Sequence, residues 1–160
     1  MKKRMILYAL YLGFLILFVG MKFTGSFSEL WMKAALVREN REAGVLNANL
    51  TPFHTISIYL RLRRNPIYLK NLVGNIIPFI PLGFFPAIVR KQKSGILFCF
   101  FTMLRGLSVV LFIELFQLVT GLGYFDVDDI LLNMCGCLIG YLLYLLPAFY
   151  AHLKSKSTRS

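Results

Sequence analysis

The chain has 160 residues, 58% of them hydrophobic and 15% aromatic, with a formal net charge of +11. The length indicates one domain, 1–160, and so high an apolar share indicates an integral membrane protein rather than a soluble domain. The basic residues are clustered and no RNA-binding motif is visible. We therefore read the charge as a sign of topology and of contact with membrane lipids, with no nucleic-acid partner.

The first apolar run follows Lys2, Lys3 and Arg4 and predicts a span over about residues 5–22. A secretory signal peptide has similar charges and a similar apolar core, but no A-x-A-like cleavage site follows the run. We therefore expect an uncleaved anchor, although its length is near the minimum for a span.

Residues 23–66 are predicted to form a long external loop. A helix is expected from Ser28 to Arg41, with Ser28 as a candidate N-cap. The residue before Pro52 avoids the α region, so Asn49 to Phe53 reads as extended chain or a turn. Phe53 to Arg64 is amphipathic and basic, which is typical of a segment lying in the membrane interface.

A second span is predicted over 67–89, and Asn65-Pro66 is a suitable helix start. Its interior carries three prolines, Pro78, Pro81 and Pro86. Each removes a backbone hydrogen bond, so we expect a broken helix whose freed carbonyls find partners in protein or in a wet cavity. A kink that serves packing alone is the alternative.

Two further spans are predicted, over 95–120 and 129–150, which completes an all-α, polytopic bundle of about four transmembrane helices. Four spans place both termini on one side. The short basic segments at 2–4, 90–93 and 154–159 then share that side, and the positive-inside rule makes it cytoplasmic, N-in/C-in. The external loop is itself basic, which conflicts with a simple count, but the rule is weak for long loops.

The three cysteines, Cys99, Cys135 and Cys137, all lie in apolar segments. Their number is odd, and Cys135 and Cys137 point about 200° apart on a helix. We therefore expect free, buried thiols that pack as small apolar side chains.

This topology brings polar side chains from separate spans to one depth in the outer half of the bundle. The candidate ligand-binding residues are Asn71, Asn75, Glu114, Gln117, Asp126, Asp129 and Asn133. Ionisable groups inside a membrane are costly, so such a cluster indicates a functional site.

Helical spacing adds to this. Glu114 and Gln117 are three residues apart and share a face, and Asp129 and Asn133 share a face with the glycines of a G-x-x-x-G pattern at 136 and 140. Those glycines allow another helix to approach closely, so this polar face should point into the bundle.

Simpler structural roles are available for the acidic residues. Asp126 can cap the last helix with Asp129 in its first turn, and Glu114 can be a structural hydrogen-bonding group. Glu114 with the three aspartates at 126, 128 and 129 would suit a hard cation, but their spacing matches no known ion-binding loop. We predict no metal site and no cofactor.

Four segments together resemble the VanZ-like family of bacterial membrane proteins. They are NLTPF (49–53), N-x-x-x-N-I-I-x-F-I-P-L-G-F (71–84), ELFQ (114–117) and F-D-x-D-D-I-x-x-N-x-x-G-x-x-x-G (125–140). The resemblance implies a small multi-pass protein of the bacterial plasma membrane with a role at the cell surface. One member of the family is associated with teicoplanin resistance, and the resemblance implies no particular reaction.

Family members often carry a basic residue just before the aspartate motif, where this chain has Tyr124-Phe125. If that residue binds an anion, another basic group must replace it here. The candidates in the loop are Arg61, Arg63, Arg64 and Lys70.

Three functional hypotheses follow. The first is that the protein binds an amphiphile, either a lipoglycopeptide or a lipid-linked cell-wall intermediate. The second is an enzyme that acts on a lipid-linked envelope intermediate through the acidic cluster, although the sequence offers no activated nucleophile. The third is a structural scaffold of the cell envelope.

Overall fold

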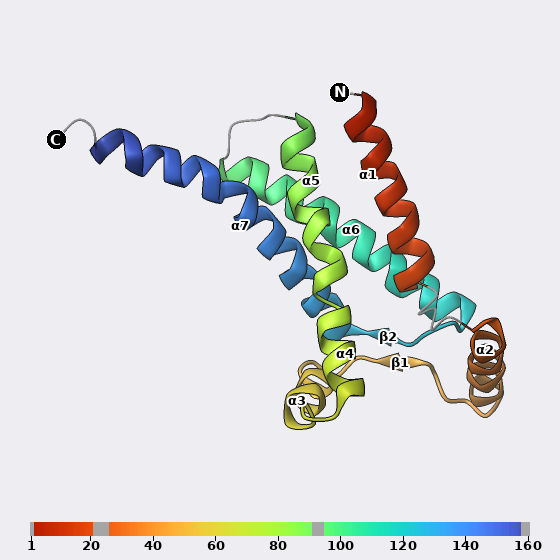
Figure 1. Ribbon diagram of the computed structural model, residues 1–160. Helices are drawn as coiled ribbons and strands as arrows, with labels where there is room; N and C mark the ends of the chain where they lie inside the picture. The colour runs from red at the N-terminus through yellow and green to blue at the C-terminus, as the bar shows by residue number, and fades with distance from the viewer. Residues whose placement is uncertain (1, 21–25, 91–94, 158–160) are drawn as a thin grey trace.

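A computed structural model describes residues 2–20, 26–90 and 95–157 (Figure 1). The helices are α1 (Lys2–Leu15), α2 (Phe27–Glu42), α3 (His54–Arg61), α4 (Pro66–Gly74), α5 (Ile80–Arg90), α6 (Ile96–Thr120) and α7 (Val127–Ser157). A π-helical turn, η1 (Ile16–Gly20), continues α1, and a 3₁₀ turn, η2 (Ile77–Phe79), joins α4 to α5. The strands are β1 (Ala48–Asn49) and β2 (Phe125–Asp126).

The structure confirms the all-α membrane bundle. Three helical segments of the described chain are long and apolar enough to cross a membrane, namely Pro66–Phe85, Ile96–Thr120 and Val127–Leu146. The first apolar segment, Met5–Leu15, is a shorter helix. Its crossing of the membrane and the N-in/C-in orientation stay predictions.

The side chains of α6 reverse the usual distribution of a soluble helix. Phe112 and Leu115 are about half exposed, whereas Glu114 and Gln117 are only 2% and 0% exposed. Apolar groups on the outside and polar groups on the inside are expected of a helix that faces lipid.

The second span is broken, as its prolines predict. Helix α4 ends at Gly74, and regular α-helix resumes only at Ile80, with Pro78 inside the intervening 3₁₀ turn. The hydroxyl of Tyr11 donates a 2.7 Å hydrogen bond to the carbonyl oxygen of Pro78. A side chain of α1 thus satisfies a carbonyl in the break, the kind of partner that the apolar surroundings require.

The G-x-x-x-G face of α7 packs directly on this break. A Cβ atom added to Gly136 or Gly140 would collide with the carbonyl oxygens of Ile76 and Ile80. The contact is reciprocal, because a Cβ atom on Gly83 would collide with the backbone of α7. The predicted packing face is therefore confirmed. The adjoining core cluster consists of Leu15, Phe79, Leu82, Val110, Ile113 and Cys137.

Two local expectations need correction. The N-cap of α2 is Ser26, whose side chain accepts a hydrogen bond from the backbone of Glu29, so the helix begins earlier than Ser28. The cysteines are free, as expected, but Cys135 is exposed rather than buried, because it points away from the face of α7 that packs on α5.

Helices α2 and α3 and the two strands gather at one end of the bundle. In Figure 1 the two short strands run between α2 on one side and α3 with α4 on the other, while the start of α1 lies at the opposite end. The strands pair in parallel, with Asn49 opposite Asp126. This pairing brings the NLTPF segment against the aspartate motif.

Candidate functional site

Asp126 is the centre of the contact between the loop and α7. It is 8% exposed, and its carboxylate accepts hydrogen bonds from the Asn49 side-chain amide at 3.3 Å and from the Thr55 hydroxyl at 2.6 Å. It also accepts from the backbone N–H of Asp128 at 2.8 Å, which is the predicted capping of α7. Asp126 therefore caps its own helix and fastens the loop at the same time.

Asp128 caps a different helix, α3. Phe53 stands at the N-cap position of α3 but supplies no side-chain acceptor, and its backbone is left-handed with φ of 64°. The carboxylate of Asp128 instead accepts hydrogen bonds from the N–H groups of Phe53 at 2.6 Å and Ile56 at 3.1 Å. A fully buried carboxylate of α7 thus completes the start of an eight-residue helix.

Glu114 and Gln117 face the interior together, as their spacing predicts. The Glu114 carboxylate accepts a 3.1 Å hydrogen bond from the backbone N–H of Asp126. The Gln117 amide donates to the carbonyl oxygen of Val19 at 3.0 Å, while its own oxygen has no hydrogen-bond partner. These two side chains connect α6 to the strand β2 and to the turn that ends α1.

Asn75 and Asp129 join the break in the second span to α7. The Asn75 amide donates a short hydrogen bond to the carboxylate of Asp129, which is 2% exposed. Asn71 lies one turn earlier on α4, and its side chain is exposed. It reaches the cluster indirectly, through a hydrogen bond with Tyr59 of α3.

The hydroxyl of Tyr59 lies in the negative potential of the three aspartates. Burial raises the pKa of its hydroxyl above the ordinary value of 10.0. The negative charges of Asp129, Asp126 and Asp128 raise it further, while the hydrogen bond with Asn71 works in the opposite direction. The phenol is therefore held in its neutral form beside the three carboxylates.

Asn133 lies one turn below Asp129 on the same face of α7. It is 1% exposed, and neither its amide nitrogen nor its oxygen has a hydrogen-bond partner. Such buried, unsatisfied groups are rare in native proteins and indicate an ordered water, an ion or a ligand. The contacts of Asn133 therefore give its polar side chain no structural role.

The predicted basic residues lie outside the buried cluster. Arg61, Arg63, Arg64 and Lys70 are all exposed around the turn from α3 to α4. Arg63 donates to the carbonyl oxygen of Leu60 at 3.3 Å, which caps the end of α3. Their charges are available at the surface next to the helix that Asp128 caps.

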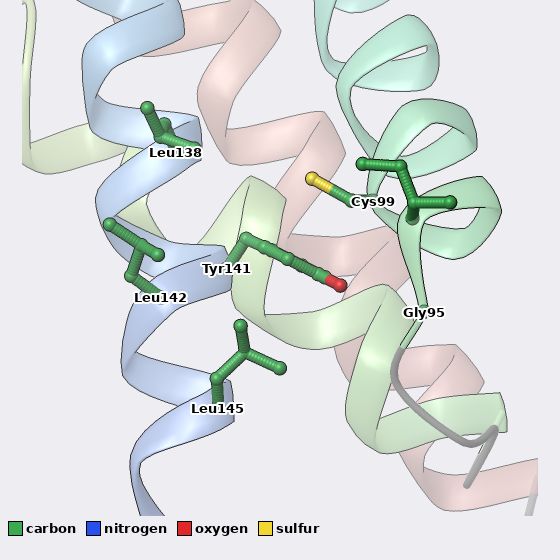
Figure 2. A pocket seen from close by; sticks show the side chains of 7 residues that line it. Gly95, Cys99, Leu138, Tyr141, Leu142 and Leu145 are labelled. Carbon is green, nitrogen blue, oxygen red and sulfur yellow. The ribbon is translucent and has the colours of Figure 1, made fainter. Parts of the chain in front are cut away.

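A separate apolar pocket lies between the beginning of α6 and the middle of α7 (Figure 2). Its volume is about 420 Å³, and Cys99 and Tyr141 are its polar lining side chains among leucines. Cys99 and Glu114 are 15 residues apart on α6, or about 22 Å along the helix axis. The pocket therefore belongs to the opposite end of the spans from the carboxylates.

Some residues that build the site escape the sequence reasoning. Asn47, Asn49, Thr55 and Tyr59 all contact the region from the loop, and neither they nor Asp128 are among the predicted ligand-binding residues. The available signal is the missing cap of α3, because a short helix that begins after Pro52-Phe53 needs a remote acceptor. Within the described part of the chain, no group of three or more His, Cys, Asp or Glu residues has the geometry to hold a metal ion.

Comparison with known proteins identifies the family of this chain. The VanZ/LLP1 family model matches residues 8–149, which include α3 to α6, both strands and every candidate residue of the site. No curated protein and no solved structure matches the chain. A match over nearly the whole chain, together with three apolar spans, identifies this membrane protein as a member of the VanZ/LLP1 family.

Proposed function

We propose that this protein binds an amphiphile at a polar site in the outer leaflet of the bacterial plasma membrane and so contributes to resistance to lipoglycopeptide antibiotics such as teicoplanin, or to a related function of the cell envelope. The ligand class is a lipoglycopeptide or a lipid-linked cell-wall intermediate. The residues assigned to the site are Asn75, Glu114, Gln117, Asp129 and Asn133. Family membership supports the resistance role at the level of the family.

The observation that carries the proposal is the unsatisfied amide of Asn133. A buried polar group without partners costs about 1–3 kcal/mol of folding free energy, so a leucine of similar size would stabilise this position. Gln117, nearer the loop end of the bundle, adds a further buried oxygen without a hydrogen-bond partner. Polar groups that are costly to folding and unused by the fold are typical of sites that meet a ligand.

The neighbouring break in the second span adds a polar contact between α4 and α7. Regular α-helix is interrupted between Gly74 and Ile80, and Asn75, which binds Asp129, lies in that interruption. A polar head group could be satisfied there by side chains of three different helices. The acyl tail would lie along the exposed apolar faces of the spans.

A structural role is the second candidate for part of the motif. The contacts of Asp126 and Asp128 go to the loop, to α3 and to the start of α7, and they account for both carboxylates. We assign these two residues to holding the loop on the bundle. The ligand-binding role is therefore proposed for the deeper residues.

The decisive experiment replaces Asn133 by leucine. Asn133→Leu is expected to keep or raise the thermal stability of the purified protein in detergent, and to lower protection of cells against teicoplanin. The matched control is Thr102→Val, because Thr102 is equally buried in α6 but its hydroxyl donates to its own helix, to Phe98. The control should leave protection unchanged.

Susceptibility should be compared for teicoplanin, its deacylated form and vancomycin at equal membrane abundance of each variant. If binding depends on the acyl chain, Asn133→Leu should change susceptibility to teicoplanin and leave susceptibility to deacylated teicoplanin and to vancomycin unchanged. Unchanged protection in a folded Asn133→Leu protein would refute binding at this site.

A further inference from the structure

A groove lies between α2 and the end of α6. The two paired strands separate it from α3 (Figure 1). Its volume is about 380 Å³, and it is lined by Trp31, Ala34, Ala35, Val37, Arg38, Arg41, Thr120 and Gly121. Thr120 is the last residue of an apolar span, so the groove lies at the level where the span leaves the hydrocarbon. This is the depth of lipid head groups.

The lining combines an aromatic ring with positive charge. Trp31 is 73% exposed, and tryptophan at a span end is typical of the membrane interface. Ala34 and Ala35 form a shallow floor that leaves room for a ligand, and the lining includes two arginines and no carboxylate.

Arg41 fixes the position of α2 against α6. Its guanidinium donates to the side chain of Asn47 and to the carbonyl oxygens of Leu118 and Val119, which are left unpaired at the end of α6. Val37 also packs on Gly121, whose left-handed backbone, with φ of 71°, ends the helix. The groove is therefore held open by contacts that need no ligand.

Arg38 supplies the available charge. Its side chain is 83% exposed, and its ion pair is with Glu42 at 3.3 Å on the same helix. Surface pairs of this kind contribute little, so a phosphate can replace Glu42 at small cost. Guanidinium groups bind phosphate oxygens well because their donors match the geometry of two acceptors.

We propose that this groove binds the head group of an anionic membrane phospholipid, with its phosphate on Arg38 and its glycerol and upper acyl chain against Trp31. The charge of the lining and its depth at the end of a span carry this assignment. The proposal does not depend on the polar cluster around Asn133.

Trp31 is the only tryptophan of the chain, so its fluorescence reports on this groove alone. The full-length protein is reconstituted in phosphatidylcholine vesicles that contain a fixed share of either brominated phosphatidylglycerol or brominated phosphatidylcholine. Brominated phosphatidylglycerol should quench Trp31 more strongly, since one basic contact enriches an anionic lipid about fivefold. Equal quenching by both lipids would mean ordinary contact with bulk lipid and would overturn the proposal.

Two variants separate the groove from net charge. Arg38→Gln should abolish the excess quenching, whereas Arg63→Gln, which removes the same charge from the distant turn after α3, should retain it. Loss of the excess in both variants would show a general charge effect and overturn the assignment. Soluble glycerol phosphate in excess should leave the quenching unchanged, and its relief would show a site for free phosphate instead of a lipid.

Discussion

The backbone N–H of Phe53 donates a 2.6 Å hydrogen bond to the buried carboxylate of Asp128, 75 positions further along the chain. This bond connects the NLTPF segment with the aspartate motif. It also explains why an aspartate can be fully buried at the start of a membrane helix, because backbone N–H groups of α3 replace the water that the carboxylate loses.

Replacing Asp128 by alanine should release α3 from the bundle. Two N–H groups lose their acceptor, and loss of a cap and of charge-assisted hydrogen bonds costs about 1–3 kcal/mol. Hydrogen exchange in detergent micelles should show faster exchange over residues 53–61. The control Glu42→Ala removes an exposed carboxylate from the Arg38 pair and should change exchange in that segment little. Unchanged protection of α3 in Asp128→Ala would contradict the capping role.

A methyl group at position 140 should loosen the packing of α7 on α5. Gly140→Ala drives a Cβ atom into the carbonyl oxygen of Ile80, and overpacking of this kind costs about 1–3 kcal/mol. The measurement is the unfolding midpoint in detergent together with abundance in the membrane. Gly13→Ala is the matched control, because nothing lies within 4 Å of a Cβ atom at that position. Equal stability of the two variants would rule out close approach of the helices.

Loss of the Tyr11 hydroxyl should weaken the attachment of α1 to the break. Tyr11→Phe leaves the Pro78 carbonyl without its donor, and hydrogen bonds between membrane helices contribute about 0.6 kcal/mol on average. Tyr8→Phe is the control, since the Tyr8 ring stacks on that of Tyr11. Identical unfolding free energies for wild type and Tyr11→Phe would argue against the bond.

Alkaline pH should destabilise the protein through Tyr59. The pKa of this phenol is raised in the folded state, so above about pH 10 the unfolded chain loses the proton while the folded chain keeps it. Stability contributed by Tyr59 is therefore full below pH 10 and is lost as pH rises, by less than about 1.4 kcal/mol per pH unit because the group is only half-buried.

The check for Tyr59 is a comparison of unfolding free energies at about pH 8 and about pH 11. Tyr59→Phe should show a smaller loss over this range than wild type, whereas the exposed Tyr124→Phe should match wild type. Parallel losses in all three proteins would place the alkaline sensitivity elsewhere.

Residue patterns with a local cause are predictable from the sequence. The proline-broken span, the Asn65-Pro66 helix start, the capping by Asp126 and the glycine face of α7 each follow from backbone chemistry or from helical spacing. The shared burial of Glu114 and Gln117 follows in the same way, since three residues separate them on one helix.

Contacts between distant segments are not predictable in this way. Helical spacing places Asp128 near the start of α7. It does not show that the Asp128 carboxylate accepts hydrogen bonds from Phe53 and Ile56, because no periodicity relates residues 75 positions apart. The parallel pairing of Asn49 with Asp126 is not predictable either, because strands of two residues show no alternation of polar and apolar side chains.

The acidic motif at 125–140 contains both kinds of feature, those with a local cause and those that depend on contacts between distant segments. Apolar length and helical spacing are local properties of the chain, so the sequence is enough to predict a membrane helix with an interior polar face. Which polar groups the fold uses becomes visible only when the segments are packed together. Two carboxylates, Asp126 and Asp128, hold the loop and α3, whereas the buried amide of Asn133 has no partner. This difference between the carboxylates and Asn133 depends on where separate segments of the chain meet, which no local pattern encodes.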